Sequence, residues 1–283
     1  MPCALDDAER SERPLWSWDG SFAIVTASGD TVTGQLRGTY RAVTGTKGRR
    51  FMTRFVFRWI NKIERFVNKQ KLKRVLRAIE SCGFPLESVY DIGANRGRWT
   101  LNMKRLLSNS KFFLFEGNDV HRQHLSSLGF SFFIGVLSSS EGSQKFYSNG
   151  GTGDSLYLEK TSHYTDSDVQ IVKTQPLNLV VGANALPHPN FVKIDVQGAE
   201  LDILSGAREI LDDCQLMYLE CPILEYNAGA PTFEMYIRYM LDLGFVPLYV
   251  LEQHVVRNSL MQVDILFIRE STKSKLLEQG IKL

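Results

Sequence analysis

From Ser88 onward, short apolar runs rich in β-branched and aromatic residues alternate with segments of helical periodicity. The runs lie at 88–92, 111–115, 131–136, 190–196 and 215–219, and the helical segments lie at 98–107, 119–128, 199–211 and 232–243. Strands that are separated by helices pair in parallel, because each helix carries the chain back across the sheet. The alternation therefore predicts an α/β domain whose parallel sheet is covered on both faces.

In the last part of this region, strands no longer alternate with helices. Two extended runs, 245–251 and 262–268, are joined by about ten polar residues, which leaves no room for a crossover helix. They must therefore pair antiparallel. A parallel sheet finished by an antiparallel C-terminal hairpin is the Rossmann-like fold of class I methyltransferases, whereas a dinucleotide-dependent dehydrogenase repeats two βαβαβ halves. We place this domain at residues 85–272 and a C-terminal tail at 273–283.

The first fifty residues are rich in Gly, Thr, Ser, Arg and Asp and show no sustained periodicity. We expect a disordered or non-native extension over residues 1–50, with one candidate hairpin from Ser21 to Thr33 around Gly29-Asp30. An isolated hairpin is marginal in water. The alternative is that the natural chain starts at Met52.

Residues 51–84 form a basic amphipathic segment. Between Lys47 and Arg77, twelve lysines and arginines face a single acid, Glu64, and apolar residues recur between them at helical spacing. Two interpretations are open. The helix packs its apolar face on the domain, which we favour because such helices are common, or residues 51–77 contact an anionic membrane surface or a phosphate-bearing substrate.

Composition excludes several other classes. The formal net charge of +2 gives no reason to expect nucleic acid as a partner. The four cysteines are scattered without a C-x-x-C pair, which indicates reduced thiols in a cytoplasmic protein. No apolar stretch approaches the roughly 20 residues that span a bilayer, and the N-terminus lacks the order of a signal peptide. We therefore expect a cytoplasmic protein.

The first predicted strand ends in a turn that is suited to ligand binding. The turn runs from Asp91 through Gly93, Ala94 and Asn95 to Gly97, where a helix follows at once. Glycine permits the tight turn and a close approach of the helix to a ligand. The turn is not the G-x-G-x-x-G of a dinucleotide fold, because a second glycine for the pyrophosphate is missing. Asp91 can instead face a cofactor that carries an amino group and a sulfonium.

The second predicted strand ends in an acid, Glu116, followed by Gly117 and Asn118. A carboxylate at this position can accept hydrogen bonds from both hydroxyls of a ribose. Each feature is weak alone, but turn, helix, strand and acid in this order predict S-adenosyl-L-methionine as the cofactor.

Four stretches together resemble the FkbM family of methyltransferases. They are DIGANRGRWT (91–100), FEGND (115–119), GTGDSLYLEKTSHY (151–164) and FVKIDVQGAELDILSGA (191–207). The resemblance implies S-adenosylmethionine-dependent methyl transfer to an oxygen, commonly a hydroxyl of a sugar, glycan or natural product. The chain departs from the commoner sequence of the family at two positions. It has Gly117 where a proline is frequent and Gln197 where an acid is frequent.

Methyl transfer needs alignment more than acid-base power, but an alcohol nucleophile must lose a proton. Asp195, at the end of the fourth strand, is the first candidate base, and capping of the helix that begins near Ala199 is its alternative role. Glu200 can pair with Lys193 or another cation. His163 and His254 lie in predicted polar connections and are further candidate bases.

Other residues can contribute to an acceptor site. Glu220, at the end of the fifth strand, can line the pocket, and Tyr157, Tyr164 and Tyr226 can stack on an acceptor. The Gly150–Ser155 segment has the composition of a mobile loop that folds over ligand, or of an ordinary exposed turn. No cluster at metal-ligand spacing is visible, so we predict catalysis without a metal. The competing interpretations are a nicotinamide-dependent oxidoreductase and an inactive scaffold that docks through the basic helix.

Overall fold

The computed structural model describes residues 21–25, 31–35, 46–148, 153–160, 169–225, 227–256 and 258–283. The chain divides into two compact units, Met1–Trp59 and Ile60–Leu283. In the first unit, β1 (Ser21–Val25) and β2 (Thr31–Gln35) pair antiparallel, at the position of the predicted hairpin. The other predictions for residues 1–45 lie outside the described residues.

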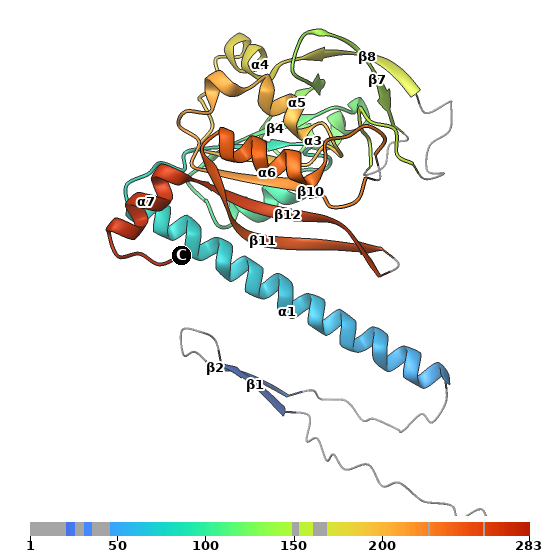
Figure 1. Cartoon of the computed structure of the whole chain (residues 1–283), viewed down its shortest axis with the longest axis vertical. Helices are drawn as coiled ribbons and strands as arrows, with labels where there is room; N and C mark the ends of the chain where they lie inside the picture. Colours follow the sequence, from blue (N-terminus) through green and yellow to red (C-terminus); the bar gives the residue numbers. More distant parts are fainter. Residues whose placement is uncertain are drawn as a thin grey trace, which may run out of the picture. The chain divides into compact units, whose positions relative to one another are not determined.

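The second unit is built on a seven-stranded sheet in the order β11-β12-β10-β9-β3-β4-β5. Figure 1 shows β10, β12 and β11 side by side at one end of this sheet. Five strands run parallel: β3 (Ser88–Ile92), β4 (Lys111–Glu116), β5 (Ser131–Ile134), β9 (Phe191–Ile194) and β10 (Leu216–Pro222). β12 (Ser259–Arg269) is antiparallel to β10 and to β11 (Phe245–Val256). This arrangement confirms the predicted α/β fold, with its parallel sheet and antiparallel C-terminal hairpin.

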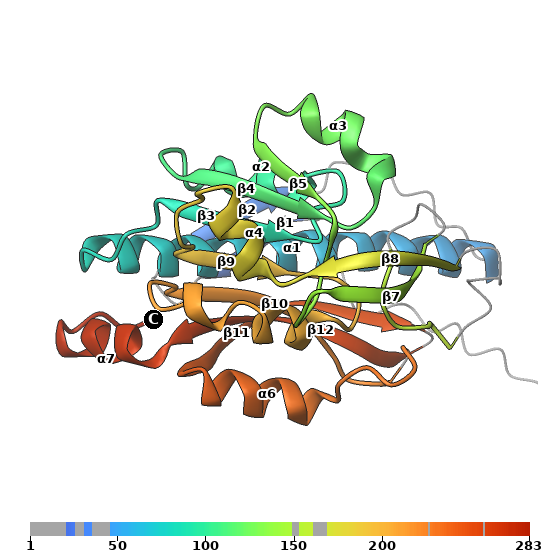
Figure 2. The ribbon, with the colours of Figure 1, turned by 90° about the horizontal axis from the view of Figure 1, so that it is seen from above.

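Helices cover both faces of the sheet, as Figure 2 shows from above. The side chains of α4 (Leu177–Ala183), α5 (Glu200–Ser205) and α6 (Phe233–Asp242) share one hydrophobic core with one face. The other core contains residues of α1 (Thr46–Ser81), α2 (Arg98–Lys104), α3 (Arg122–Ser126) and α7 (Glu270–Glu278). Short 3-10 helices lie at Asp119–His121 and Arg208–Ile210. Alternate residues of each buried strand therefore point into different cores.

Several elements differ from the prediction. The run 131–136 is interrupted at Gly135, and β6 (Val136–Leu137) joins a second sheet in the order β6-β8-β7, with β7 (Gly142–Tyr147) and β8 (Val169–Gln175). Most of the polar connection predicted after Leu251 is strand, because β11 and β12 satisfy each other's backbone groups beyond the apolar core. The predicted tail at 273–283 contains most of α7, which buries Leu276.

The helix α1 changes character along its length. Near its end, Leu72, Val75 and Ile79 are buried against the sheet. Earlier, Phe66 and Val67 remain 52% and 43% exposed. The interpretation that the helix packs on the domain thus holds for the last turns of α1.

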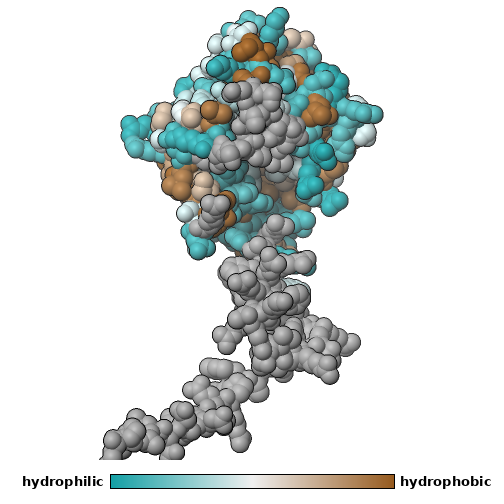
Figure 3. All heavy atoms as spheres, turned by 90° about the vertical axis from the view of Figure 1, so that its right-hand side faces the viewer, coloured by the Kyte–Doolittle hydropathy of each residue, from teal (hydrophilic) through white to brown (hydrophobic). Residues whose placement is uncertain are grey.

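On the face in Figure 3, outside the grey atoms, hydrophobic residues form separate groups among hydrophilic ones. Over the part of the chain that the structure describes, no helix is long and apolar enough to cross a membrane.

Candidate active site

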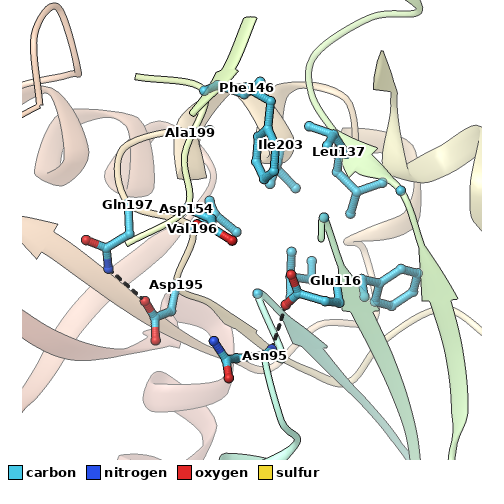
Figure 4. Close-up of a pocket in the computed structure, with 17 residues that line it drawn as sticks. Asn95, Glu116, Leu137, Phe146, Asp154, Asp195, Val196, Gln197, Ala199 and Ile203 are labelled. Carbon is cyan, nitrogen blue, oxygen red and sulfur yellow. Dashed lines mark hydrogen bonds between the residues drawn. The ribbon is translucent and has the colours of Figure 1, made fainter. Parts of the chain in front are cut away.

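A pocket of about 840 Å³, including its open mouth, lies at the carboxyl ends of β3, β4 and β9. This edge is where open α/β sheets bind their ligands. In Figure 4 the pocket has a polar end, with Asn95, Glu116 and Asp195, and an apolar end formed by Leu137, Phe146 and Ile203. Such a division suits a ligand with one flat apolar part and one charged part.

The turn after β3 supplies the pocket floor. Gly93 and Asn95 line the pocket, with φ angles of 73° and 49°. A Cβ at Gly93 would overlap the carbonyl oxygen of Asp195, so only glycine fits between β3 and β9. Ala94 is buried and Gly97 packs against Leu128, and neither belongs to the pocket lining. Both residues shape the turn, and their predicted contact with the cofactor stays a prediction.

Glu116 stands at the carboxyl end of β4 with its side chain in the pocket wall. Its Oε2 accepts a hydrogen bond from the backbone N–H of Asn95 at 2.6 Å, and its Oε1 accepts one from the N–H of Asn118 at 2.8 Å. Burial raises the pKa of this carboxyl, and the two backbone donors oppose that shift. Each oxygen keeps a second lone pair, so the carboxylate is fixed in place and can still accept hydroxyl hydrogens.

The residues after Glu116 differ in their placement. Gly117 lines the pocket, as the sequence predicted for a ligand contact. Asn118 does not: its Oδ1 accepts from the Val120 N–H, and its amide nitrogen donates to Ser148 and to Asp154. Asp154 itself lines the pocket. Asn118 therefore positions a wall residue that belongs to the predicted Gly150–Ser155 loop.

Asp91 does not face the pocket, which corrects the predicted contact with the cofactor. Its side chain is fully buried, and its Oδ2 accepts a hydrogen bond from Thr100 at 2.6 Å. Its Oδ1 lies 3.2 Å from Nζ of Lys193, because the parallel pairing of β3 with β9 sets these two residues side by side. The acid thus acts below the pocket floor, through a buried ion pair.

Lys193 joins the strand ends that carry the pocket. Its ammonium also lies 3.3 Å from Oδ2 of Asp195 and donates to the carbonyl of Gly93 at 2.9 Å. Burial lowers the pKa of the lysine, but the carboxylates of Asp195 and Asp91 outweigh burial and raise it. The residue is therefore a buried cation that holds two acids and the glycine turn together.

Asp195 lines the pocket and its side chain is 41% exposed. Burial would raise its pKa, but Lys193 and a hydrogen bond from Gln197 bring the pKa below its ordinary value. The predicted alternative, capping of the following helix, is wrong: the cap residue is Ala199, and the Asp195 side chain is turned toward Lys193 and Gln197. The carboxylate is thus available to a ligand as an acceptor of hydrogen bonds.

The loop after Asp195 is held by Glu200. Gln197 and Gly198 adopt φ angles of 61° and 115°. The Glu200 carboxylate is 1% exposed and accepts hydrogen bonds from the N–H groups of Val196 and Gly198 and from the hydroxyl of Tyr236. The sequence suggested that Glu200 pairs with Lys193 or another cation, but these hydrogen bonds engage it instead. It is a positioning residue for the pocket wall.

Of the remaining predicted residues, those that the structure describes do not line the pocket. His163, Tyr164 and Tyr226 fall outside the described residues, as do Gly150, Gly151 and Thr152. His254 lies in β11 rather than in a connection, with its Nε2 4.0 Å from Oδ1 of Asp264.

Two other predicted acceptor contacts are likewise engaged elsewhere. The Tyr157 hydroxyl donates to Asp202 at 2.8 Å. Glu220 accepts hydrogen bonds from the amides of Gln197 and Gln262 and does not line the pocket.

The charges of the pocket test the predicted cofactor. Its lining contains three carboxylates, Glu116, Asp154 and Asp195, and among the described lining residues there is no lysine, arginine or histidine. Such a wall repels the diphosphate of a dinucleotide and attracts an amino group and a sulfonium. The residues therefore fit S-adenosylmethionine and speak against the nicotinamide alternative.

Comparisons with known proteins gave structural neighbours and a family match. Solved structures similar to this chain include precorrin-6y C5,15-methyltransferase from Geobacter metallireducens, with 14% identity, 69% of this chain and 86% of that chain covered, and a TM-score of 0.35. Fibrillarin from Methanococcus jannaschii has 9% identity, coverages of 65% and 66%, and a TM-score of 0.41. These scores are low, so the identification depends on the family match. No curated protein matches the chain.

A family model described as the methyltransferase FkbM domain matches residues 91–247, which is more than half of the 283 residues. The match includes the glycine turn, Glu116 and the Asp195–Glu200 loop. The chain therefore belongs to the FkbM methyltransferase family, whose methyl donor is S-adenosylmethionine.

Proposed function

We propose that this methyltransferase transfers the methyl group to a hydroxyl of a sugar, glycan or natural-product acceptor. The observation that carries the proposal is the partly exposed carboxylate of Asp195, which lies across the pocket from Glu116 (Figure 4). A hydroxyl needs a hydrogen-bond acceptor to align its oxygen and take up its proton. The resemblance to the FkbM family described above implies an oxygen acceptor.

Different residues of the pocket bind the cofactor and orient the acceptor. S-adenosylmethionine supplies a methyl group on a positively charged sulfur. Gly93 and Asn95 form the floor of the pocket. Glu116 would bind the ribose hydroxyls of the cofactor, and Leu137, Phe146 and Ile203 would enclose its flat base. Asp195 orients the acceptor hydroxyl. Because Lys193 lowers its pKa, we assign Asp195 to orientation first and to proton removal only as the oxygen loses its proton during transfer.

Replacing Asp195 with asparagine tests this role. The amide keeps the shape but offers one acceptor oxygen and no negative charge, so we expect kcat to fall by about a hundredfold, within the range for a positioned acid-base group. The KM for S-adenosylmethionine should change less than threefold. Transfer of labelled methyl groups to a panel of hydroxyl compounds, read by mass spectrometry, identifies the acceptor and gives both constants. Asp242→Asn, at an exposed position in α6, is the control. An unchanged kcat would remove Asp195 from the reaction.

We also propose a cytoplasmic enzyme whose α1 helix contacts anionic membrane surfaces. Phe66 and Val67 are exposed one after the other on a helix whose charge is strongly positive. Apolar insertion and attraction to anionic lipid act together in such helices. The free thiols of Cys82, Cys214 and Cys221 support a reducing compartment.

Co-sedimentation with vesicles tests the membrane contact. We expect the full chain to bind vesicles that contain phosphatidylserine, to bind neutral vesicles at least fivefold less, and to be released by high salt. The double change Phe66→Ser and Val67→Ser should reduce binding, whereas Leu277→Ser, at an exposed position of α7, should not. Equal partition of both variants would exclude a role for this stretch of α1.

A further inference from the structure

A second polar cluster lies behind the pocket. Glu220 of β10 and Asp264 of β12 are direct cross-strand neighbours, and they are only 6% and 9% exposed. In the next strand, β11, Glu252 is paired with Asp264 and His254 with Gln262. One ligand atom each of Glu220, His254 and Asp264 lies within 4.8 Å of the other two. Three strands thus bring together two buried carboxylates and an imidazole.

The hydrogen-bond partners that the structure gives the two carboxyls are neutral side chains. Glu220 receives hydrogen bonds from the neutral amides of Gln197 and Gln262. Oδ2 of Asp264 accepts from the Tyr218 hydroxyl at 2.8 Å. Like charges directly opposite each other across strands are destabilising, and buried charges are normally paired or bound to a metal. The amides and the hydroxyl supply hydrogen bonds but no positive charge.

One oxygen of the cluster points specifically to a ligand. Oδ1 of Asp264 is buried and accepts no hydrogen bond from the described residues, and it is the oxygen that faces His254. The nearby buried cation, Lys193, is engaged by Asp91 and Asp195 instead. A buried acceptor without a donor is unusual in a folded protein and calls for an ion or a water.

We propose that Glu220, His254 and Asp264 bind a divalent metal cation. Two carboxylates with one imidazole suit ions such as Mn²⁺, Fe²⁺ or Zn²⁺, whereas Ca²⁺ and Mg²⁺ prefer oxygen ligands alone. The His254 side chain is 47% exposed, so an ion can enter from solvent on this side. The inference does not depend on the proposed acceptor.

The side chain of Gln197 links the site to the pocket. The Gln197 amide donates to Glu220 and, at 3.2 Å, to Asp195. An ion on Glu220 would therefore lie behind the pocket wall and fix the loop that carries Asp195. Its contribution is to position that loop, not to contact the reacting atoms.

Titration of the chelator-treated full chain with MnCl₂, by calorimetry and by the electron paramagnetic resonance of free Mn²⁺, tests the site. We expect one Mn²⁺ per chain, and at least tenfold weaker binding for Asp264→Asn and for His254→Gln. Glu234→Gln removes an exposed acid of α6 and should leave the affinity unchanged. Because His254 is half exposed, its replacement should preserve the fold, which circular dichroism can check.

A second readout separates specific from surface binding. Mn²⁺ should raise the melting temperature of the wild-type chain and of Glu234→Gln but not that of His254→Gln. The proposal is overturned by a wild-type chain that binds neither Mn²⁺ nor Zn²⁺ saturably, or by unchanged affinity in both ligand variants. Binding of S-adenosylmethionine, measured separately, reports on the proposed function and not on this site.

Discussion

Lys193→Met should destabilise the folded chain by about 3–5 kcal/mol, which is the usual cost of removing one partner of a buried ion pair. Methionine keeps the length and apolar stem of lysine but leaves Asp91, which is fully buried, beside a neutral group. It also deprives Asp195 and the Gly93 carbonyl of their shared cation. The measurement is urea unfolding followed by circular dichroism at pH 7.

A double variant distinguishes lost charge balance from lost packing. Adding Asp91→Asn to Lys193→Met removes the orphaned carboxylate, so we expect about 2 kcal/mol or more of the lost stability to return. Lys173→Met, at an exposed position of β8, should change stability by less than about 0.5 kcal/mol. A loss below about 1 kcal/mol for Lys193→Met would show that the buried cation is dispensable.

Glu116→Gln should weaken the binding of S-adenosylmethionine ten- to a hundredfold, or about 1.5–3 kcal/mol, as expected for hydrogen bonds to a charged group. Both oxygens of the carboxylate accept a backbone N–H, from Asn95 and Asn118. A glutamine must place its NH₂ against one of these donors, so the variant loses the charge and also loosens the turn. Isothermal titration with the cofactor gives the affinity.

The controls for this prediction address folding and position. Glu234→Gln makes the same chemical change on the exposed face of α6 and should bind the cofactor like the wild type. Thermal unfolding of Glu116→Gln shows whether any loss of affinity reflects a loss of fold. A folded variant with unchanged affinity would mean that the ribose lies elsewhere, and the cofactor orientation proposed above would have to be abandoned.

The sequence by itself determined the strands of the main sheet, their parallel pairing with a C-terminal hairpin, and the edge where the pocket lies. These features follow from local periodicity and from the rule that parallel strands end at one edge of the sheet. Gly93 and Glu116 could be identified for the same reason, since each directly follows or ends a strand.

Only the tertiary structure decided the partners of the buried acids. From the sequence alone, Asp91 is predicted to face the pocket. In the structure, the pairing of β3 with β9 places it against Lys193, which is remote in sequence. The cluster of Glu220, His254 and Asp264 likewise arises where three strands meet. Local periodicity fixes which face a residue takes, but the charge opposite it is set by strand register between distant segments, and that register is chosen by the packing of the whole core.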